Sequence, residues 1–265
     1  MLVGPLALAD DVNMDDFNID LGDDALGGPG GANTVTYSGG HSERKGEVGS
    51  NIPITVSHLG GPITVRCTDS DQISGRIDFQ IEGTTGEKAK AFGDGIGISV
   101  YGDKVSGGAK TRVPAKSSAI VSTDIPFVVT VPLQAKLTIT GGDGPITVSN
   151  CVGTIKASNT KGDINIQGSF TSFSVSAPSG DVSLDMGPDS KVSTASSISA
   201  PKGNVRLKMP RSTNNNLDAS GSEVMVDFLV TGTNTATRVA GQLGSGGPAI
   251  KVSAPKGTVT VGIND

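Results

Sequence analysis

The sequence predicts an all-β fold, a single-stranded right-handed parallel β-solenoid (β-helix) with coils of about 18 residues. The prediction rests first on a repeated unit: a glycine, a turn residue and an apolar-polar-apolar triplet. Segments that begin at Gly144, Gly162 and Gly180 carry this unit at intervals of 18 residues. Composition agrees, because 265 residues with 38 Gly, seven Phe, two Tyr and no Trp suit a narrow core in which each coil buries a few Val and Ile side chains against its neighbours.

Each coil is expected to hold two short strands separated by tight turns. A second unit begins at Gly153, halfway through the coil that starts at Gly144, and upstream Pro53 and Pro62 open two Pro-Ile-Thr-Val segments nine residues apart. Alternation within a strand points one side chain inward and the next into solvent. Glycine is expected at the corners because it adopts positive φ without steric cost.

The repeat continues beyond Gly180 after an insertion of five residues, at Gly203, and then at Gly221 and Gly257 in multiples of 18. We therefore expect coils stacked in the order of the sequence. Residues 50–265 would form roughly a dozen coils and a rod of roughly 55 Å, at about 4.8 Å per coil. An antiparallel β-sandwich is the alternative, since it also spaces strands by about 8 to 12 residues. A sandwich gives no reason for a constant period.

The chain divides into an acidic, Gly-rich N-terminal arm, residues 1–49, and a β-solenoid domain, residues 50–265. The net charge is −5, but residues 1–43 hold eight of the 26 acids and none of the 21 bases. The remainder has 18 acids and 21 bases, a net charge of +3. Neither part shows a concentrated basic stripe, so no nucleic-acid partner is expected. Residues 83–117, rich in Gly, Lys and Ala, are expected to form longer loops between coils.

Four segments resemble the bacterial DUF4097 family of putative adhesins, β-solenoid domains marked by repeated Gly-Asp-Ile-x-Val units. They are Val-Pro-Leu at 131–133, Gly-Gly-Asp-Gly-Pro-Ile-Thr-Val at 141–148, and the longer runs 153–166 and 244–261. The resemblance covers roughly residues 50–265. It implies the solenoid fold and an adhesin-like role, and the family has no catalytic signature to carry over.

The first nine residues end in Ala-Leu-Ala before Asp10, which resembles the cleavage side of a secretory signal. An exported protein (periplasm, cell surface or extracellular) is therefore predicted, with a cytoplasmic protein as the alternative. The chain contains no stretch of 18 apolar residues, so no membrane span is expected.

Cys67 and Cys151 each follow a Gly-Pro-Ile-Thr-Val segment, so they share a type of position. With 84 residues between them, they would lie several coils apart in a sequential solenoid, too far for a disulfide. Two buried free thiols are therefore favoured, and a disulfide in an exported protein is the alternative.

No catalytic, cofactor-binding or metal-ligating residue is predicted, and no cofactor. Asp163 and Asp181 are interpreted as turn residues of the Gly-Asp units, and His41 and His58 as surface or turn histidines without a nucleophile motif beside them. The segment 16–27 opens like a Ca²⁺ loop but has Leu at its sixth position and Gly at its twelfth, so it is not an EF-hand. The segment 93–97 lacks the third glycine of a dinucleotide fingerprint and is interpreted as a turn.

These observations predict a non-enzymatic structural or adhesin-like protein of the bacterial cell envelope or exterior. It would act through its faces or by self-association through open coil ends or the N-terminal arm, with a cell-surface protein or polysaccharide as further partner. A carbohydrate-binding or carbohydrate-cleaving β-helix is the alternative. Nine aromatic residues in the whole chain leave few rings for stacking on sugars.

Overall fold

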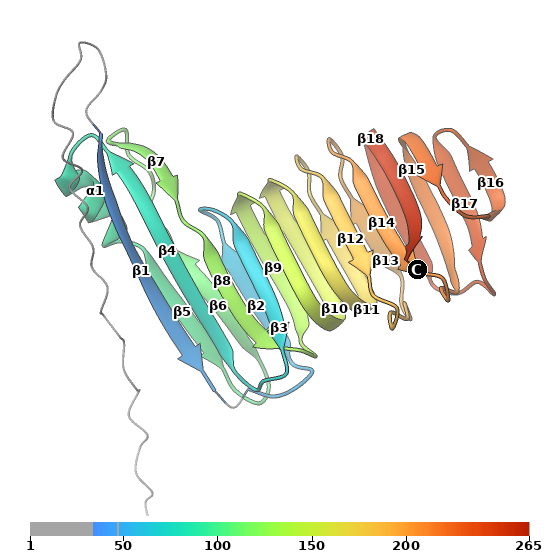
Figure 1. The fold of residues 1–265 in the computed structure, drawn as a ribbon, viewed down its shortest axis with the longest axis horizontal. Helices are drawn as coiled ribbons and strands as arrows, with labels where there is room; N and C mark the ends of the chain where they lie inside the picture. The colour runs from blue at the N-terminus through green and yellow to red at the C-terminus, as the bar shows by residue number, and fades with distance from the viewer. Residues whose placement is uncertain (1–33, 47, 265) are drawn as a thin grey trace, which may run out of the picture.

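The fold was determined as a computed structural model, which describes residues 34–46 and 48–264. Two β-sheets face each other along an elongated body (Figure 1). The N-terminal elements are β1 (Val35–Lys45), β2 (Pro53–His58), β3 (Ile63–Thr68), β4 (Ile73–Gly83), α1 (Gly86–Gly93), β5 (Gly97–Gly102), β6 (Gly107–Arg112), β7 (Ile120–Asp124), β8 (Phe127–Pro132) and β9 (Lys136–Asp143). The remaining strands are β10 (Ile146–Lys161), β11 (Ile164–Ser176), β12 (Val182–Met186), β13 (Ser196–Ser199), β14 (Val205–Pro210), β15 (Asn215–Val226), β16 (Thr231–Thr235), β17 (Arg238–Leu243) and β18 (Ala249–Asn264).

The long strands β10, β11, β15 and β18 bend at a corner and contribute to both sheets. The first sheet has the order β5-β6-β2-β9-β10-β11-β13-β18-β15-β17-β16, and the second sheet has the order β1-β4-β8-β3-β10-β11-β12-β14-β18-β15. Strands from β8 to β15 pair in parallel on the second sheet, in a register that joins Ile146 to Ile164 and Ile164 to Val182. The predicted parallel β-solenoid with an 18-residue period is confirmed, and the sandwich alternative is wrong.

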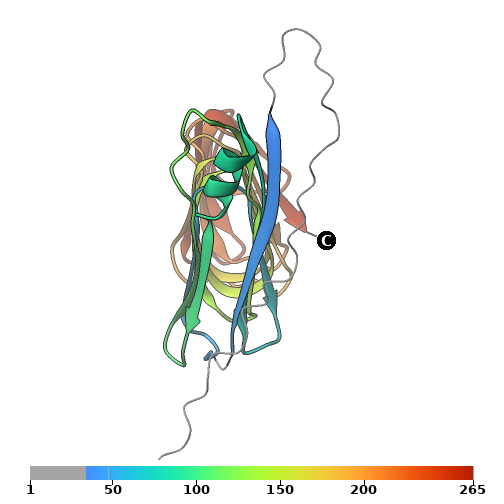
Figure 2. The ribbon, with the colours of Figure 1, turned by 90° about the vertical axis from the view of Figure 1, so that its left-hand side faces the viewer.

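The core is a narrow layer between the two sheets, seen end-on in Figure 2. Strand β10 shows the alternation that builds it: Ile146 and Val148 are buried, and Thr147 between them is exposed. Across the described residues the largest fully buried side chains include Phe127, Phe170 and Phe173. The remaining core positions are mostly Val, Ile, Leu and Ala, as expected for a thin solenoid.

The N-terminal end of the rod is closed by antiparallel strands and a helix. Strand β1 pairs with β4 along its whole length and packs against β5, where the Glu43 carboxylate accepts the Val100 N–H at 2.7 Å. The Thr85 side chain caps α1 by accepting the Lys88 N–H, and the helix buries Phe92 against the end of the core.

Strand β1 lies within the range 1–49 that we expected to be an arm, so part of that range belongs to the body. Helix α1, β5 and β6 occupy the range 83–117, where longer loops were expected, and the segment 93–97 lies at the end of the helix. The helix was missed because eight residues are too few for a clear amphipathic period. The signal-like segment 1–9 and the Ca²⁺-loop-like segment 16–27 lie outside the described residues.

The coils do not stack in the order of the sequence at the C-terminal end. Strand β18 lies between β14 and β15 on the second sheet and between β13 and β15 on the first. Strand β15 therefore forms the outer coil, and the antiparallel strands β17 and β16 extend the first sheet beyond it. The expected position of Gly257 beyond Gly221 is wrong, because the hairpin of β16 and β17 returns the chain to a gap between two earlier coils.

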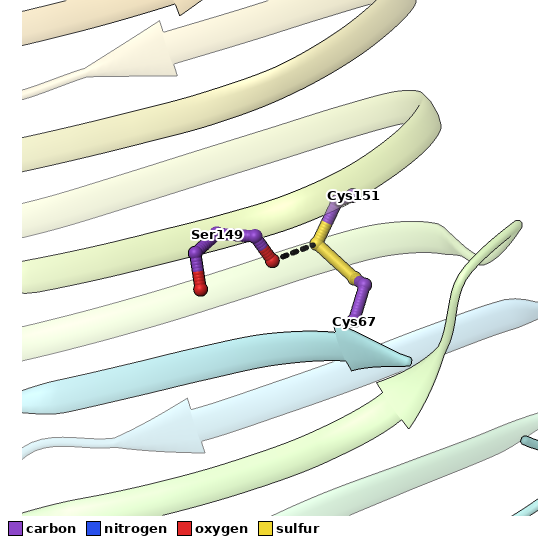
Figure 3. Close-up of a disulfide and its surroundings, with 3 residues drawn as sticks. All are labelled: Cys67, Ser149 and Cys151. Carbon is purple, nitrogen blue, oxygen red and sulfur yellow. Dashed lines mark hydrogen bonds between the residues drawn. A yellow bond between two sulfur atoms is a disulfide. The ribbon is translucent and has the colours of Figure 1, made fainter. Parts of the chain in front are cut away.

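A second insertion places β2 and β3 between elements that come much later in the sequence. Strand β3 lies between β8 and β10, and β2 lies between β6 and β9. Cys67 on β3 is thereby one coil from Cys151 on β10, and the two form a disulfide with a Cα–Cα distance of 4.9 Å (Figure 3). The expectation of two free thiols is wrong because sequence separation did not measure the number of coils between them.

Corner glycines set the distance between coils. A Cβ at Gly180, Gly203 or Gly257 would lie 2.1, 2.1 or 2.0 Å from the carbonyl oxygen of the glycine one coil away. Gly144 and Gly162 in addition have positive φ, 97° and 107°. Positive φ, the reason expected from the sequence, thus applies to only some of these corner glycines. All of them share a close approach to the backbone of the neighbouring coil.

Replacement of Gly180 by Ala is expected to lower the free energy of unfolding by about 3 kcal/mol, because the new methyl group would force two backbones apart in a packed interior. Chemical denaturation monitored by circular dichroism measures it. Gly97→Ala is the control, since its Cβ would meet nothing nearer than the Arg112 side chain at 3.9 Å. Equal stability of the two variants would contradict the role of the glycine column.

Replacement of both cysteines, Cys67→Ser with Cys151→Ser, is expected to lower the free energy of unfolding by about 2 to 5 kcal/mol, because the disulfide closes a loop of 84 residues and limits the unfolded chain. The midpoint in guanidinium chloride measures the loss. Reductant should destabilise the wild type by a similar amount and leave the double variant unchanged. A wild type insensitive to reductant would contradict this expectation.

Candidate functional site

Beside the corner glycines, polar side chains link one coil to the next. The Asp181 N–H donates to Oδ1 of Asp163 at 2.8 Å, the Asn204 N–H donates to Oδ1 of Asp181 at 2.7 Å, and the Thr258 N–H donates to Oδ1 of Asn204 at 2.9 Å. Asp163, Asp181 and Asn204 each follow a corner glycine, as expected of turn residues, but each side chain accepts a hydrogen bond from the backbone of the neighbouring coil. These residues form a polar column whose carboxylates and amide are held in fixed positions by these hydrogen bonds.

A groove of about 380 Å³ runs along this column on the outside of the second sheet. Its lining residues are Asp163, Asn165, Asp181, Val182, Ser183, Asn204, Val205, Arg206, Thr258 and Thr260. The groove crosses four neighbouring strands, β11, β12, β14 and β18, whose outward residues Asn165, Ser183, Arg206 and Thr260 lie in register.

The lining combines fixed acceptors with exposed donors. One oxygen of the Asp163 carboxylate is engaged by the backbone, while the guanidinium of Arg206 and the amide of Asn165 are exposed to solvent. Such a set can bind a molecule rich in hydroxyl groups, in which each hydroxyl both donates and accepts. Sequence reasoning missed Asn165 and Arg206, although their outward position in the repeated triplet was a usable signal.

The outer surface of the first sheet is different in character and is called the lysine–hydroxyl face below. One row across this sheet consists of hydroxyl residues in seven consecutive strands: Ser57, Thr140, Ser158, Ser176, Ser199, Ser253 and Ser220. Exposed Lys156 on β10 and Lys251 on β18 lie in the adjacent row of this face, and exposed Lys136 on β9 lies one row further away.

His58 is fully buried at the end of β2, which corrects its interpretation as a surface or turn residue. Its Nε2 lies 2.7 Å from the Ile125 carbonyl oxygen and its Nδ1 lies 2.6 Å from Oγ1 of Thr111. A carbonyl only accepts, so Nε2 carries the proton and Nδ1 accepts from the Thr111 hydroxyl. Burial lowers the pKa of His58, and the hydrogen bond to Ile125 opposes that shift.

His41 is exposed on β1, with its ring 5.9 Å from that of Phe79. The structure thus places the two histidines in different environments and brings neither into the groove. Over the residues that the structure describes, no group of three or more His, Cys, Asp or Glu side chains could hold a metal ion. No helix in residues 34–46 and 48–264 is long and apolar enough to cross a membrane.

The profile of the Toastrack DUF4097 family matches residues 110–262, and the chain belongs to this family. Among solved structures, the chain is similar to a putative cell adhesion protein from Clostridium sporogenes, with 11% identity and a TM-score of 0.51 over 85% of this chain and 100% of the other. It is also similar to a putative adhesin from Bacteroides fragilis, with 15% identity and a TM-score of 0.40 over 85% and 97% of the two chains. No protein with a curated description matches the sequence.

The likeness to the Clostridium sporogenes protein shows a shared fold. Together with the family match, it confirms the resemblance noted from the Gly-Asp-Ile units of the sequence. The match begins near β6, so the antiparallel elements β1, β4 and β5 lie outside the family's profile.

The stability of the protein is expected to fall with pH below about 6.5, the ordinary pKa of histidine. The folded pKa of His58 is lowered, so in this range the unfolded state binds the proton and the folded state does not. The loss approaches about 1.4 kcal/mol per pH unit for one proton. Urea unfolding between pH 7.5 and 5 measures it.

His58→Gln should have a flatter pH dependence than the wild type, and His41→Gln should retain the wild-type slope. If His58→Gln kept the full slope, the buried imidazole would not be its origin.

Proposed function

We propose that this protein is a non-enzymatic, adhesin-like β-solenoid that binds a polysaccharide of a cell surface through the groove on its second sheet. The observation that supports this most is the groove itself, which places Asn165, Ser183, Arg206 and Thr260 in one line across parallel strands. Neighbouring strands are about 4.8 Å apart, so the groove repeats its hydrogen-bonding groups along an axis. A polymer with repeated hydroxyl groups is suited to such a surface.

A binding role is favoured over cleavage by the use of the carboxylates. Acid–base cleavage of a glycosidic bond needs two carboxyl groups available to the substrate. Here Oδ1 of Asp163 and Oδ1 of Asp181 each accept a backbone N–H from the next coil, and Asp181 also accepts from the Asn204 amide. These carboxylates therefore stabilise the corner of the solenoid by linking neighbouring coils, which suits a rigid binding surface.

The disulfide supports an exported location. Cys67 and Cys151 are both buried and joined, and disulfides form and persist in oxidising compartments. A protein of the periplasm, the cell surface or the exterior would meet this condition.

The faces are favoured over the ends as the adhesive surface. At one end β1, β5 and α1 cover the last coil, and at the other the hairpin of β16 and β17 extends beyond β15. Strand β16 has five residues, all polar or glycine and all exposed, and short polar edge strands discourage pairing between molecules. Self-association by stacked coil ends is thus the less favoured of the two modes.

A glycan array probed with the full chain tests the proposal, and binding of a bacterial surface polysaccharide is the expected result. The double variant Asn165→Ala with Arg206→Ala should weaken binding about tenfold, since each lost side chain removes hydrogen bonds. The matched control is Thr138→Ala with Lys156→Ala, which removes one polar and one basic side chain from the other sheet. Equal affinity of both variants would contradict the groove, and release of reducing ends from a bound glycan would contradict the non-enzymatic role.

A further inference from the structure

The lysine–hydroxyl face carries an excess of positive charge. Lys110 and Arg112 on β6 extend the set of exposed bases that contains Lys136, Lys156 and Lys251. The sequence shows no basic run here, because these residues are far apart along the chain. The pairing of β6, β9, β10 and β18 within one sheet brings them onto one surface. The basic patch therefore exists only in the folded chain.

Acids do not balance these bases on the flat part of the face, between its two corners. Across the described strands β6, β2, β9, β10, β11, β13, β18 and β15, the acid among the outward residues of this part is Asp218. It is already paired with Arg238 at 3.0 Å. The outer surface of the second sheet differs, because it carries both signs and pairs Arg76 with Asp78 at 2.9 Å. An excess of one sign thus distinguishes the first sheet.

The corners at the two edges of the face contain acids as well, but bases accompany them. From β9 to β18, the corner that carries the polar column has three acids and three bases: Asp143, Asp163, Asp181, Lys161, Lys202 and Lys256. Glu223 follows them on β15. At the opposite edge the exposed acids Asp103 and Asp189 each lie within two residues of an exposed lysine. The positive excess is therefore confined to the flat part of the face.

Hydroxyl residues fill the intervals between the lysines. One row runs in register through six strands and consists of Thr55, Thr138, Lys156, Ser174, Ser197 and Lys251. The row of seven hydroxyl residues lies beside it. Across the strands, Lys156 is three strands from Lys110 and three strands from Lys251, about 14 Å in each direction. The face thus presents a cation at every third strand, with hydroxyl groups between the cations.

This pattern fits a linear polymer with repeated phosphate groups. A lysine ammonium acts as a point charge on a phosphate, and hydroxyl groups donate hydrogen bonds to phosphate oxygens. Carboxylates are matched better by the planar fork of arginine, and the arginines of this face, Arg112 and Arg238, lie near its two ends. In the described strands between β9 and β15, no aromatic side chain points outward from this face, so nucleic-acid bases would find no ring for stacking.

We propose that the lysine–hydroxyl face binds a phosphodiester-linked polyol, a polymer of the glycerol phosphate class, laid across the strands. Phosphates would pair with Lys110, Lys156 and Lys251, and the serine and threonine hydroxyls between these lysines would donate to further phosphate oxygens. Individual exposed ion pairs are weak, so affinity depends on several contacts made along one polymer chain. The proposal does not depend on the polysaccharide groove, which lies on the opposite sheet.

Titration of fluorescent poly(glycerol phosphate) with the full wild-type chain, followed by anisotropy, tests the proposal. Binding should be saturable at low salt and should weaken as salt is raised. The triple variant Lys110→Gln, Lys156→Gln, Lys251→Gln should bind about tenfold more weakly at low salt, because three exposed ion pairs are lost. Its slope of log affinity against log salt should be smaller by about 2, since each phosphate contact contributes about 0.7 to that slope.

The charge-matched control Lys45→Gln, Lys88→Gln, Lys208→Gln changes lysines on β1, α1 and β14, away from the first sheet. It should keep the wild-type affinity and salt slope. Equal weakening of the two triple variants, or no binding by the wild type at low salt, would overturn the proposal. Tighter binding of single-stranded DNA or of polygalacturonate with the same number of charges would also overturn it, because the preferred polymer would then be a nucleic acid or a polycarboxylate.

Acetylation of the wild-type chain by acetic anhydride, mapped by mass spectrometry, tests where the polymer lies. Saturating poly(glycerol phosphate) should slow the acetylation of Lys110, Lys156 and Lys251 and leave that of Lys45 and Lys88 unchanged. Equal protection of all five lysines, or no protection of the first three, would contradict a site on the lysine–hydroxyl face.

Discussion

The contact between a glycine Cα and the carbonyl oxygen of the glycine one coil away controls the geometry of this solenoid. A Cβ would lie 2.0 to 2.1 Å from that oxygen at Gly180, Gly203 and Gly257, so no side chain is tolerated there. This approach brings neighbouring corners close enough for Asp163, Asp181 and Asn204 to bond the backbone of the next coil. The rigid polar column and the groove beside it thus depend on the absence of a Cβ atom at these glycines.

The same contact joins coils that are distant in the sequence. Gly257 packs on Gly203 because β18 lies between β14 and β15, and Cys67 meets Cys151 because β3 lies between β8 and β10. Strand β18 is held on both sides by earlier parts of the chain, and β3 is held on both sides by later parts. The solenoid is therefore an interlocked body, and its long faces remain as surfaces for partners.

The sequence predicts the period but not the neighbours of each coil. Spacing showed that Gly144, Gly162 and Gly180 occupy equivalent corners, because the same steric constraint recurs in every coil. It could not show that β18 is an inserted coil, since Gly221 and Gly257 keep the same period in either order. The disulfide and strand β1 were missed for a related reason: both depend on which distant segments pair. The outward position of Arg206 was predictable from alternation, whereas a groove requires the four strands together.

Amide hydrogen exchange of the native protein, followed by mass spectrometry, tests the interlocked order most directly. If β18 is an inner coil, its amides between Ile250 and Val261 should exchange as slowly as those of β11, by global unfolding, while β16 at the end of the first sheet exchanges fast. If the coils followed the order of the sequence, β18 would be the terminal strand and would exchange early, together with the chain end. That result would contradict the order of coils described above.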